Sequence, residues 1–66
     1  MNRPTKMSRR KFIAICMEEG LNRDLARQLY THFKSKKPSL LIDTEGTEDW
    51  VRVSASTASA VYKQKN

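Results

Sequence analysis

The sequence contains few of the residues from which metal sites, disulfide frameworks and catalytic centres are built. Among its 66 residues are one cysteine, one histidine and two glycines. A single cysteine excludes an internal disulfide and a multi-cysteine zinc site, and two isolated glycines exclude a glycine-rich phosphate loop. The longest apolar run, Phe12 to Met17, has six residues, whereas a membrane-spanning helix needs about 20. We therefore expect a binding protein without a cofactor or a membrane span, and not an enzyme.

The length allows one small domain. A chain of this size buries only about 60% of the surface of its unfolded form. The core is therefore small, and a homodimer is one way to enlarge it. The basic N-terminus is not followed by the apolar segment of a secretion signal, so we expect a cytoplasmic protein.

Positive charge is the most prominent feature of the composition. Lysine and arginine total 13 against seven acidic residues, a net charge of +6. Residues 1–17 contain five bases and no acid, whereas residues 38–50 contain four acids and no base. A basic surface attracts phosphate backbones, anionic lipids and acidic proteins, although charge can also serve solubility alone. If the partner is a nucleic acid, we expect the acidic segment to point away from it.

The first half of the chain is expected to begin with a flexible basic arm over residues 1–7. A helix then covers residues 8–19, because Ser8 can cap its N-terminus and Gly20 can end it. Cys16 lies within the apolar run and is expected to be a core residue.

A second helix is expected over residues 22–36, with Asn22 as its cap. Apolar residues at helical spacing give this helix one buried face, and they are Leu25, Leu29 and Phe33. Pro38 ends the helix, because the residue before a proline avoids the α region.

The second half is expected to contain a β-hairpin and a short helix. Residues 39–43 and 50–53 have the composition of strands, and residues 43–46 fit the turn that would join them. Residues 57–65 can form a short C-terminal helix or a further strand. The expected fold class is α+β, with two N-terminal helices, a wing-like β-hairpin and a short C-terminal helix in one domain over residues 8–66.

The first helix carries its charges in the order that opposes the helix macrodipole. Arg9, Arg10 and Lys11 lie at its positive end, and Glu18 and Glu19 lie at its negative end. A local rule broken in this way can mark a functional site, here one for an anion such as phosphate. The alternative is a small cost that salt screens.

The second helix carries a basic stripe opposite its apolar face. Arg23, Arg27, Tyr30 and Lys34 recur at helical spacing, and such side chains bind phosphates and base edges. The alternative is an ordinary solvated helix face. The expected nucleic-acid contacts are Arg9, Arg10, Lys11, Arg23, Arg27, Tyr30, Lys34, Lys36 and Lys37.

Other residues have competing interpretations. Trp50 and Arg52 are of the types enriched at protein-interaction hot spots, whereas the alternative for Trp50 is a half-buried packing role. His32 has no second ligand or acid near it in the sequence, so we expect a packing or surface role. The acids of residues 43–49 do not follow the spacing of a calcium loop, and we expect them to form a solvated turn.

The arrangement resembles a reduced winged-helix or helix-turn-helix module of the kind seen in small bacteriophage regulators. The resemblance rests on Gly20-Leu21-Asn22 as the turn, residues 23–34 as a recognition-type helix and residues 40–53 as the wing. It implies transcription regulation through DNA binding, although many small bacteriophage regulators bind host proteins instead. We therefore expect a nucleic-acid-binding protein, with DNA favoured over RNA. The alternative is a protein-interaction module, such as an inhibitor of a host transcription or repair enzyme.

Overall fold

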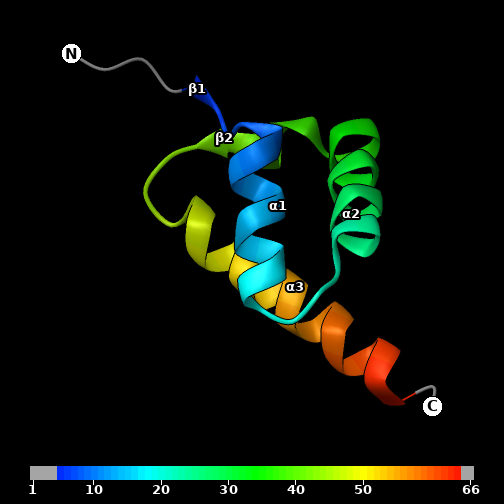
Figure 1. The fold of residues 1–66 in the computed structure, drawn as a ribbon. Helices are drawn as coiled ribbons and strands as arrows, with labels where there is room; N and C mark the ends of the chain where they lie inside the picture. Colours follow the sequence, from blue (N-terminus) through cyan, green and yellow to red (C-terminus); the bar gives the residue numbers. More distant parts are fainter. Residues whose placement is uncertain (1–4, 65–66) are drawn as a thin grey trace.

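Helices dominate the fold. The computed structural model describes residues 5–64, and describes side chains over residues 5–62. The main elements are α1 (Arg9–Glu18), α2 (Arg23–Lys36) and α3 (Thr47–Gln64), and the minor ones are β1 (Thr5–Lys6), the 3-10 helix η1 (Pro38–Leu41) and β2 (Ile42–Asp43). Figure 1 shows α1 and α2 side by side, with α3 crossing the end of α1 and continuing past both helices. The expected α+β class is confirmed.

The two N-terminal helices begin and end where local signals place them. The Ser8 hydroxyl accepts a hydrogen bond from the Lys11 backbone N–H at 3.1 Å, and the Asn22 side chain accepts one from the Leu25 N–H at 2.8 Å. Both caps satisfy donors that a helix start leaves without a partner. Gly20 follows α1 with φ of +105°, a conformation that favours glycine.

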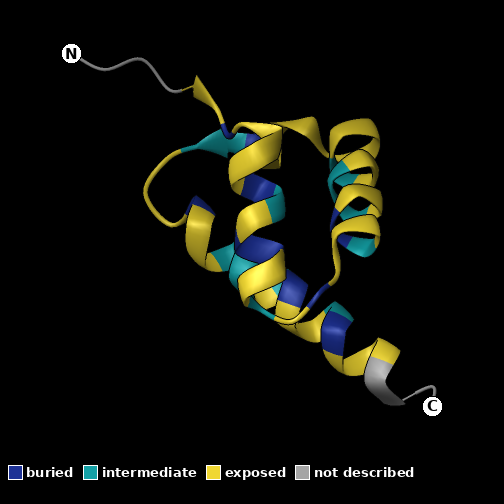
Figure 2. Cartoon of the chain, in the orientation of Figure 1, coloured by how far each residue is buried: buried dark blue, intermediate teal, exposed yellow. Residues whose placement is uncertain are grey.

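The core lies where α1 packs against α2 on one side and α3 on the other. Figure 2 shows the buried residues gathered on the facing sides of these elements. The Phe12 ring is fully buried, with its centroid 5.4 Å from that of Tyr30 and 6.2 Å from that of Phe33 in edge-to-face geometry. Cys16 is also fully buried, which confirms its expected core role.

Residues 5–7 contact the rest of the fold, so the expectation of a flexible arm over residues 1–7 is wrong for these three residues. Thr5 and Lys6 of β1 pair antiparallel with Asp43 and Ile42 of β2. Met7 is 1% exposed, and its N–H donates to the Leu41 carbonyl at 2.7 Å. Burial of this one large side chain fixes the residues beside it. The remainder of the expected arm, residues 1–4, lies outside the described residues.

The expected hairpin partner, residues 50–53, is wrong because this segment lies in α3. Residues 39–43, expected as one strand, are mostly the 3-10 helix η1, and only β2 is extended. The strand pattern came from Val51 and Val53, but Val51 is buried and Val53 is 66% exposed. A longer window shows buried residues every four positions, which is the helical period, and they are Thr47, Val51, Ala55 and Ser59.

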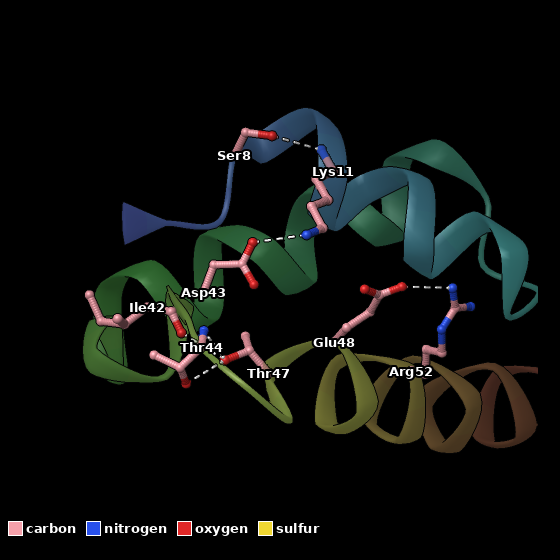
Figure 3. A network of polar contacts seen from close by, with 8 residues as sticks. All are labelled: Ser8, Lys11, Ile42, Asp43, Thr44, Thr47, Glu48 and Arg52. Atoms are coloured by element: carbon pink, nitrogen blue, oxygen red, sulfur yellow. Dashed lines mark hydrogen bonds and ion pairs between the residues drawn. The ribbon is translucent and has the colours of Figure 1, made fainter. Parts of the chain in front are cut away.

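The turn expected over residues 43–46 precedes a helix and not a returning strand. Gly46 has φ of +91°. The Thr47 hydroxyl accepts from the Thr44 N–H at 2.9 Å and donates to the Ile42 carbonyl at 2.7 Å (Figure 3). These contacts start α3 directly after β2. The C-terminal segment, expected as helix or strand, is helix up to Gln64, and the helix is much longer than expected.

Within residues 5–64, no helix has the length and hydropathy needed to cross a membrane.

Candidate nucleic-acid interface

A shallow groove between α1 and α2 brings arginines from both helices together. We call it the α1–α2 groove; its volume is about 600 Å³, and it is lined by Arg9, Arg10, Ile13, Ala14, Met17, Arg23 and Arg27. Among the described side chains, no acid lines it. The antiparallel course of the two helices in Figure 1 explains the convergence, since residues far apart in sequence face one another.

A second concave surface continues from this groove onto the outer side of α2. This outer α2 surface shares Arg9 and Arg27 with the groove. Its other lining residues are Asp24, Gln28, Thr31, His32, Ser35 and Lys36. Figure 2 shows that the side of α2 facing away from α1 is largely exposed. Apart from Asp24, the residues that line this surface are basic or uncharged, so basic groups and neutral hydrogen-bonding groups share one continuous face.

Lys11, an expected nucleic-acid contact, is bound within the protein. Its ammonium group lies 2.9 Å from a carboxylate oxygen of Asp43 (Figure 3). The hydrogen bond to Asp43 raises the pKa of Lys11 above its ordinary value. Its contact joins α1 to β2, so this cation has a structural partner that Arg9 and Arg10 do not have among the described residues.

Arg52, expected as an anchor for a protein partner, also has internal partners. Its guanidinium group lies 3.1 Å from Glu48, 3.1 Å from Glu19 and 3.4 Å from Glu18. Hydrogen bonds to Glu48 and then to Glu19 raise the pKa of Arg52. The acids at the unfavourable end of the α1 dipole are therefore compensated by a cation from α3. At the N-terminal end of α1, Asp43 neutralises Lys11 in a similar way. Of the charges that oppose the α1 dipole, Arg9 and Arg10 are therefore the two without an ion-pair partner among the described residues.

The aromatic candidates contribute to packing. Tyr30, expected on the basic stripe, is half-buried and packs on Phe12. Trp50 is half-buried, and its ring centroid lies 5.0 Å from that of Phe33, which confirms the packing alternative. His32 is exposed beside Phe33.

The lysines at the end of α2 are divided between two positions. All three, Lys34, Lys36 and Lys37, are exposed, but of these only Lys36 lines the outer α2 surface. The structure thus brings together Arg9, Arg10, Arg23, Arg27 and Lys36 from the expected contacts.

The apolar floor of the groove was missed at the sequence level. Ile13, Ala14 and Met17 belong to the apolar run Phe12 to Met17, in which the sequence predicted no binding residue, and Met17 is 43% exposed. Their spacing on α1 is the signal that could have separated them from the buried Phe12 and Cys16, because residues one turn apart share a helix face.

Comparison of the chain with protein-family models, curated proteins and solved structures gave no match. Across the part of the chain that the structure describes, no cluster of three or more His, Cys, Asp or Glu side chains is placed to hold a metal ion. The charge and shape of the surface are therefore what indicate its ligand.

Proposed function

We propose that this protein is a nucleic-acid-binding regulator that acts in the cytoplasm and contacts phosphates through the α1–α2 groove and the outer α2 surface. The observation that carries the proposal is the convergence of Arg9, Arg10, Arg23 and Arg27 on one groove without a lining acid. Guanidinium groups match phosphate oxygens with paired donors.

The length of the groove suits a nucleic-acid backbone. Arg9 and Met17 lie about 12 Å apart along the α1 axis at the rise of an α-helix. That distance covers roughly three phosphates of one B-DNA strand. Duplex DNA is favoured over duplex RNA, because a helix exposed like α2 fits the major groove of B-DNA and not the deep, narrow major groove of A-form RNA.

The acidic segment supports this orientation. In Figure 1 the turn between β2 and α3 lies on the opposite side of α1 from α2. Two acids of the segment, Asp43 and Glu48, pair with Lys11 and Arg52. A polyanion on the α2 side therefore meets positive charge without facing this turn.

The test is binding to duplex DNA, single-stranded DNA and RNA across a salt series. An Arg9→Ala/Arg27→Ala variant should flatten the dependence of log affinity on log salt by up to about two units. A Lys6→Ala/Lys37→Ala variant removes the same charge from outside both surfaces and should change the slope less. Equal effects would show that only net charge matters, and an absence of salt-dependent binding would refute the proposal.

An acidic protein segment is the second candidate ligand, and the apolar floor of the groove favours it. Ile13, Ala14 and Met17 offer an apolar contact between arginines, which suits a peptide that alternates carboxylates with aliphatic side chains. A Met17→Ser variant should then weaken binding of a helical peptide rich in Glu and Leu. DNA affinity should be unchanged in the same variant, because phosphate contacts do not use the thioether.

A further inference from the structure

The outermost side of α2 carries polar residues that the proposed phosphate contacts leave unused. Four exposed residues recur along it at spacings of four, three and four positions, and they are Asp24, Gln28, Thr31 and Ser35. This spacing keeps them on one face of the helix, opposite the buried Ala26 and the half-buried Phe33. We call these four residues the α2 polar row, and all of them line the outer α2 surface.

Cations border the α2 polar row on both sides. Each residue of an α-helix is rotated by about 100° from the one before it, so Arg27 and Lys36 lie on opposite flanks of the row. Arg9 of α1 lines the same surface and shares the α1–α2 groove with Arg27. A helix in the major groove of a duplex has a phosphate backbone on each side and base edges beneath it. The order of cation, polar row and cation matches this arrangement.

The α2 polar row has the dimensions of a segment of the major groove. From Asp24 to Ser35 the helix rises about 17 Å, which corresponds to about five base pairs. The major groove of B-DNA is about 12 Å wide and admits an α-helix. Figure 2 shows this side of α2 exposed. Within residues 5–62, no hydrogen bond of the protein uses a side chain of the row, so its donors and acceptors are available to a ligand.

The carboxylate of Asp24 distinguishes base reading from phosphate binding. It is the one acid among the described residues that line the outer α2 surface. A carboxylate repels phosphates, so it weakens a surface that binds only the backbone. In the major groove, by contrast, a carboxylate accepts a hydrogen bond from the amino group of cytosine. The amide of Gln28 matches the paired acceptor and donor of adenine.

We propose that the α2 polar row reads base edges in the major groove, which makes the protein a sequence-specific binder of duplex DNA. The inference rests on the proposed nucleic-acid function and goes beyond it, because phosphate contacts carry no sequence information directly. Gln28 contacts an adenine and Asp24 contacts a cytosine within a site of about five base pairs. The cations on the two flanks bind the backbones and set the position of the row over the bases.

Selection of the full chain on a duplex library with a randomised centre tests the proposal. We expect an enriched motif, and binding about tenfold or more tighter to the selected duplex than to a shuffled duplex of the same composition. Gln28→Glu should replace adenine by cytosine at one position of the motif, because a carboxylate accepts from the cytosine amino group. Thr31→Ala should change or weaken the motif. Its matched control is Thr57→Ala at an exposed threonine of α3, which should leave the motif unchanged.

Asp24→Asn separates base reading from charge. It should strengthen binding to the shuffled duplex, because it removes a negative charge from the phosphate-binding side, and it should reduce the preference for the selected duplex. Circular dichroism checks that each variant is folded. Salt-dependent binding without an enriched motif, or a motif that Gln28→Glu does not change, would overturn base reading and leave the proposed phosphate contacts standing. An absence of binding to any duplex would refute both.

Discussion

Helices α2 and α3 differ in where they place their charged residues. In α2, cations lie on exposed sides of the helix, with Arg23, Arg27 and Lys36 lining concave surfaces. In α3, the described charged residues are confined to the first turns, and Arg52 bonds to Glu48 and to two acids at the C-terminal end of α1, Glu18 and Glu19. The rest of the described α3 is neutral.

This difference shows that the neighbours of a cation determine its role more than its residue type does. Arg27 lies on α2 and Arg52 lies on α3. The guanidinium of Arg52 connects two helices, whereas that of Arg27 lines the groove proposed to bind phosphate. One helix can therefore be tested as a binding element and the other as a structural element.

The largest expected effect comes from removing the packing that holds α2 against α1. Phe12→Ala deletes the fully buried ring that contacts Tyr30 and Phe33. Such a change costs about 3–5 kcal/mol, which is similar to the whole stability that a core of this size supplies. We expect an unfolded chain by circular dichroism. The control is Val61→Ala at an exposed residue of α3, which should change the free energy of unfolding by less than about 0.5 kcal/mol. A folded Phe12→Ala variant would contradict the view that the Phe12 ring is needed to hold α2 against α1.

The buried thiol of Cys16 should make the free energy of unfolding depend on pH. Burial raises the pKa of the Cys16 thiol from 9.0 to about 11. Above about pH 9 the unfolded chain loses this proton while the folded chain keeps it, so stability should fall by about 2 kcal/mol between pH 9 and 11. Urea titrations across this range measure the loss. Cys16→Ala should reduce the slope, and the remaining slope includes Lys11, whose raised pKa acts in the same direction.

Substitution of the glycines before α2 and α3 is expected to cause a smaller loss of stability, and the loss should differ between the two positions. Both have positive φ, and a Cβ at Gly20 would lie 2.7 Å from the Ser59 hydroxyl of α3, whereas a Cβ at Gly46 would meet open space. Gly46→Ala should cost about 1 kcal/mol from backbone strain alone. Gly20→Ala should cost about 1 kcal/mol more. Equal losses in thermal unfolding would show that Ser59 moves aside without cost.

The α1–α2 half of the fold could be predicted because its signals are short-range. Ser8 and Asn22 each cap the helix that begins at the next residue, and Gly20 ends the first helix at the expected place. These contacts join residues three positions apart, so a short stretch of sequence is enough to predict them.

The other half depends on contacts between distant residues. β2 pairs with β1 across a separation that includes α1 and α2, and the burial of Met7 that accompanies it had no local signal. The short alternation of Val51 and Val53 fits a strand until the helical spacing of buried residues over the whole of α3 is known. The four residues 50–53 alone are therefore too short a segment to distinguish a strand from a helix.

The candidate site also has a part that could be predicted from local sequence and a part that depends on distant residues. The sequence predicted Arg9, Arg10, Arg23 and Arg27 as nucleic-acid contacts, from the order of charges along the first helix and from the spacing of the basic stripe on the second. It did not predict that Lys11 and Arg52 are occupied, since their partners in other elements lie more than 30 residues away along the chain.

The comparison of Arg27 with Arg52 is the finest test of the division between the two helices. Arg27→Ala should flatten the salt dependence of DNA binding by about one unit and leave thermal stability unchanged, because its side chain is exposed. Arg52→Ala should lower the melting temperature by leaving Glu18, Glu19 and Glu48 close together without their cation, and should leave the DNA slope unchanged in the folded protein. Salt should reduce the stability difference between Arg52→Ala and the parent chain, because it screens exposed ion pairs. If both variants weaken DNA binding equally, the arginines act only through net charge, and the α1–α2 groove is not the binding surface.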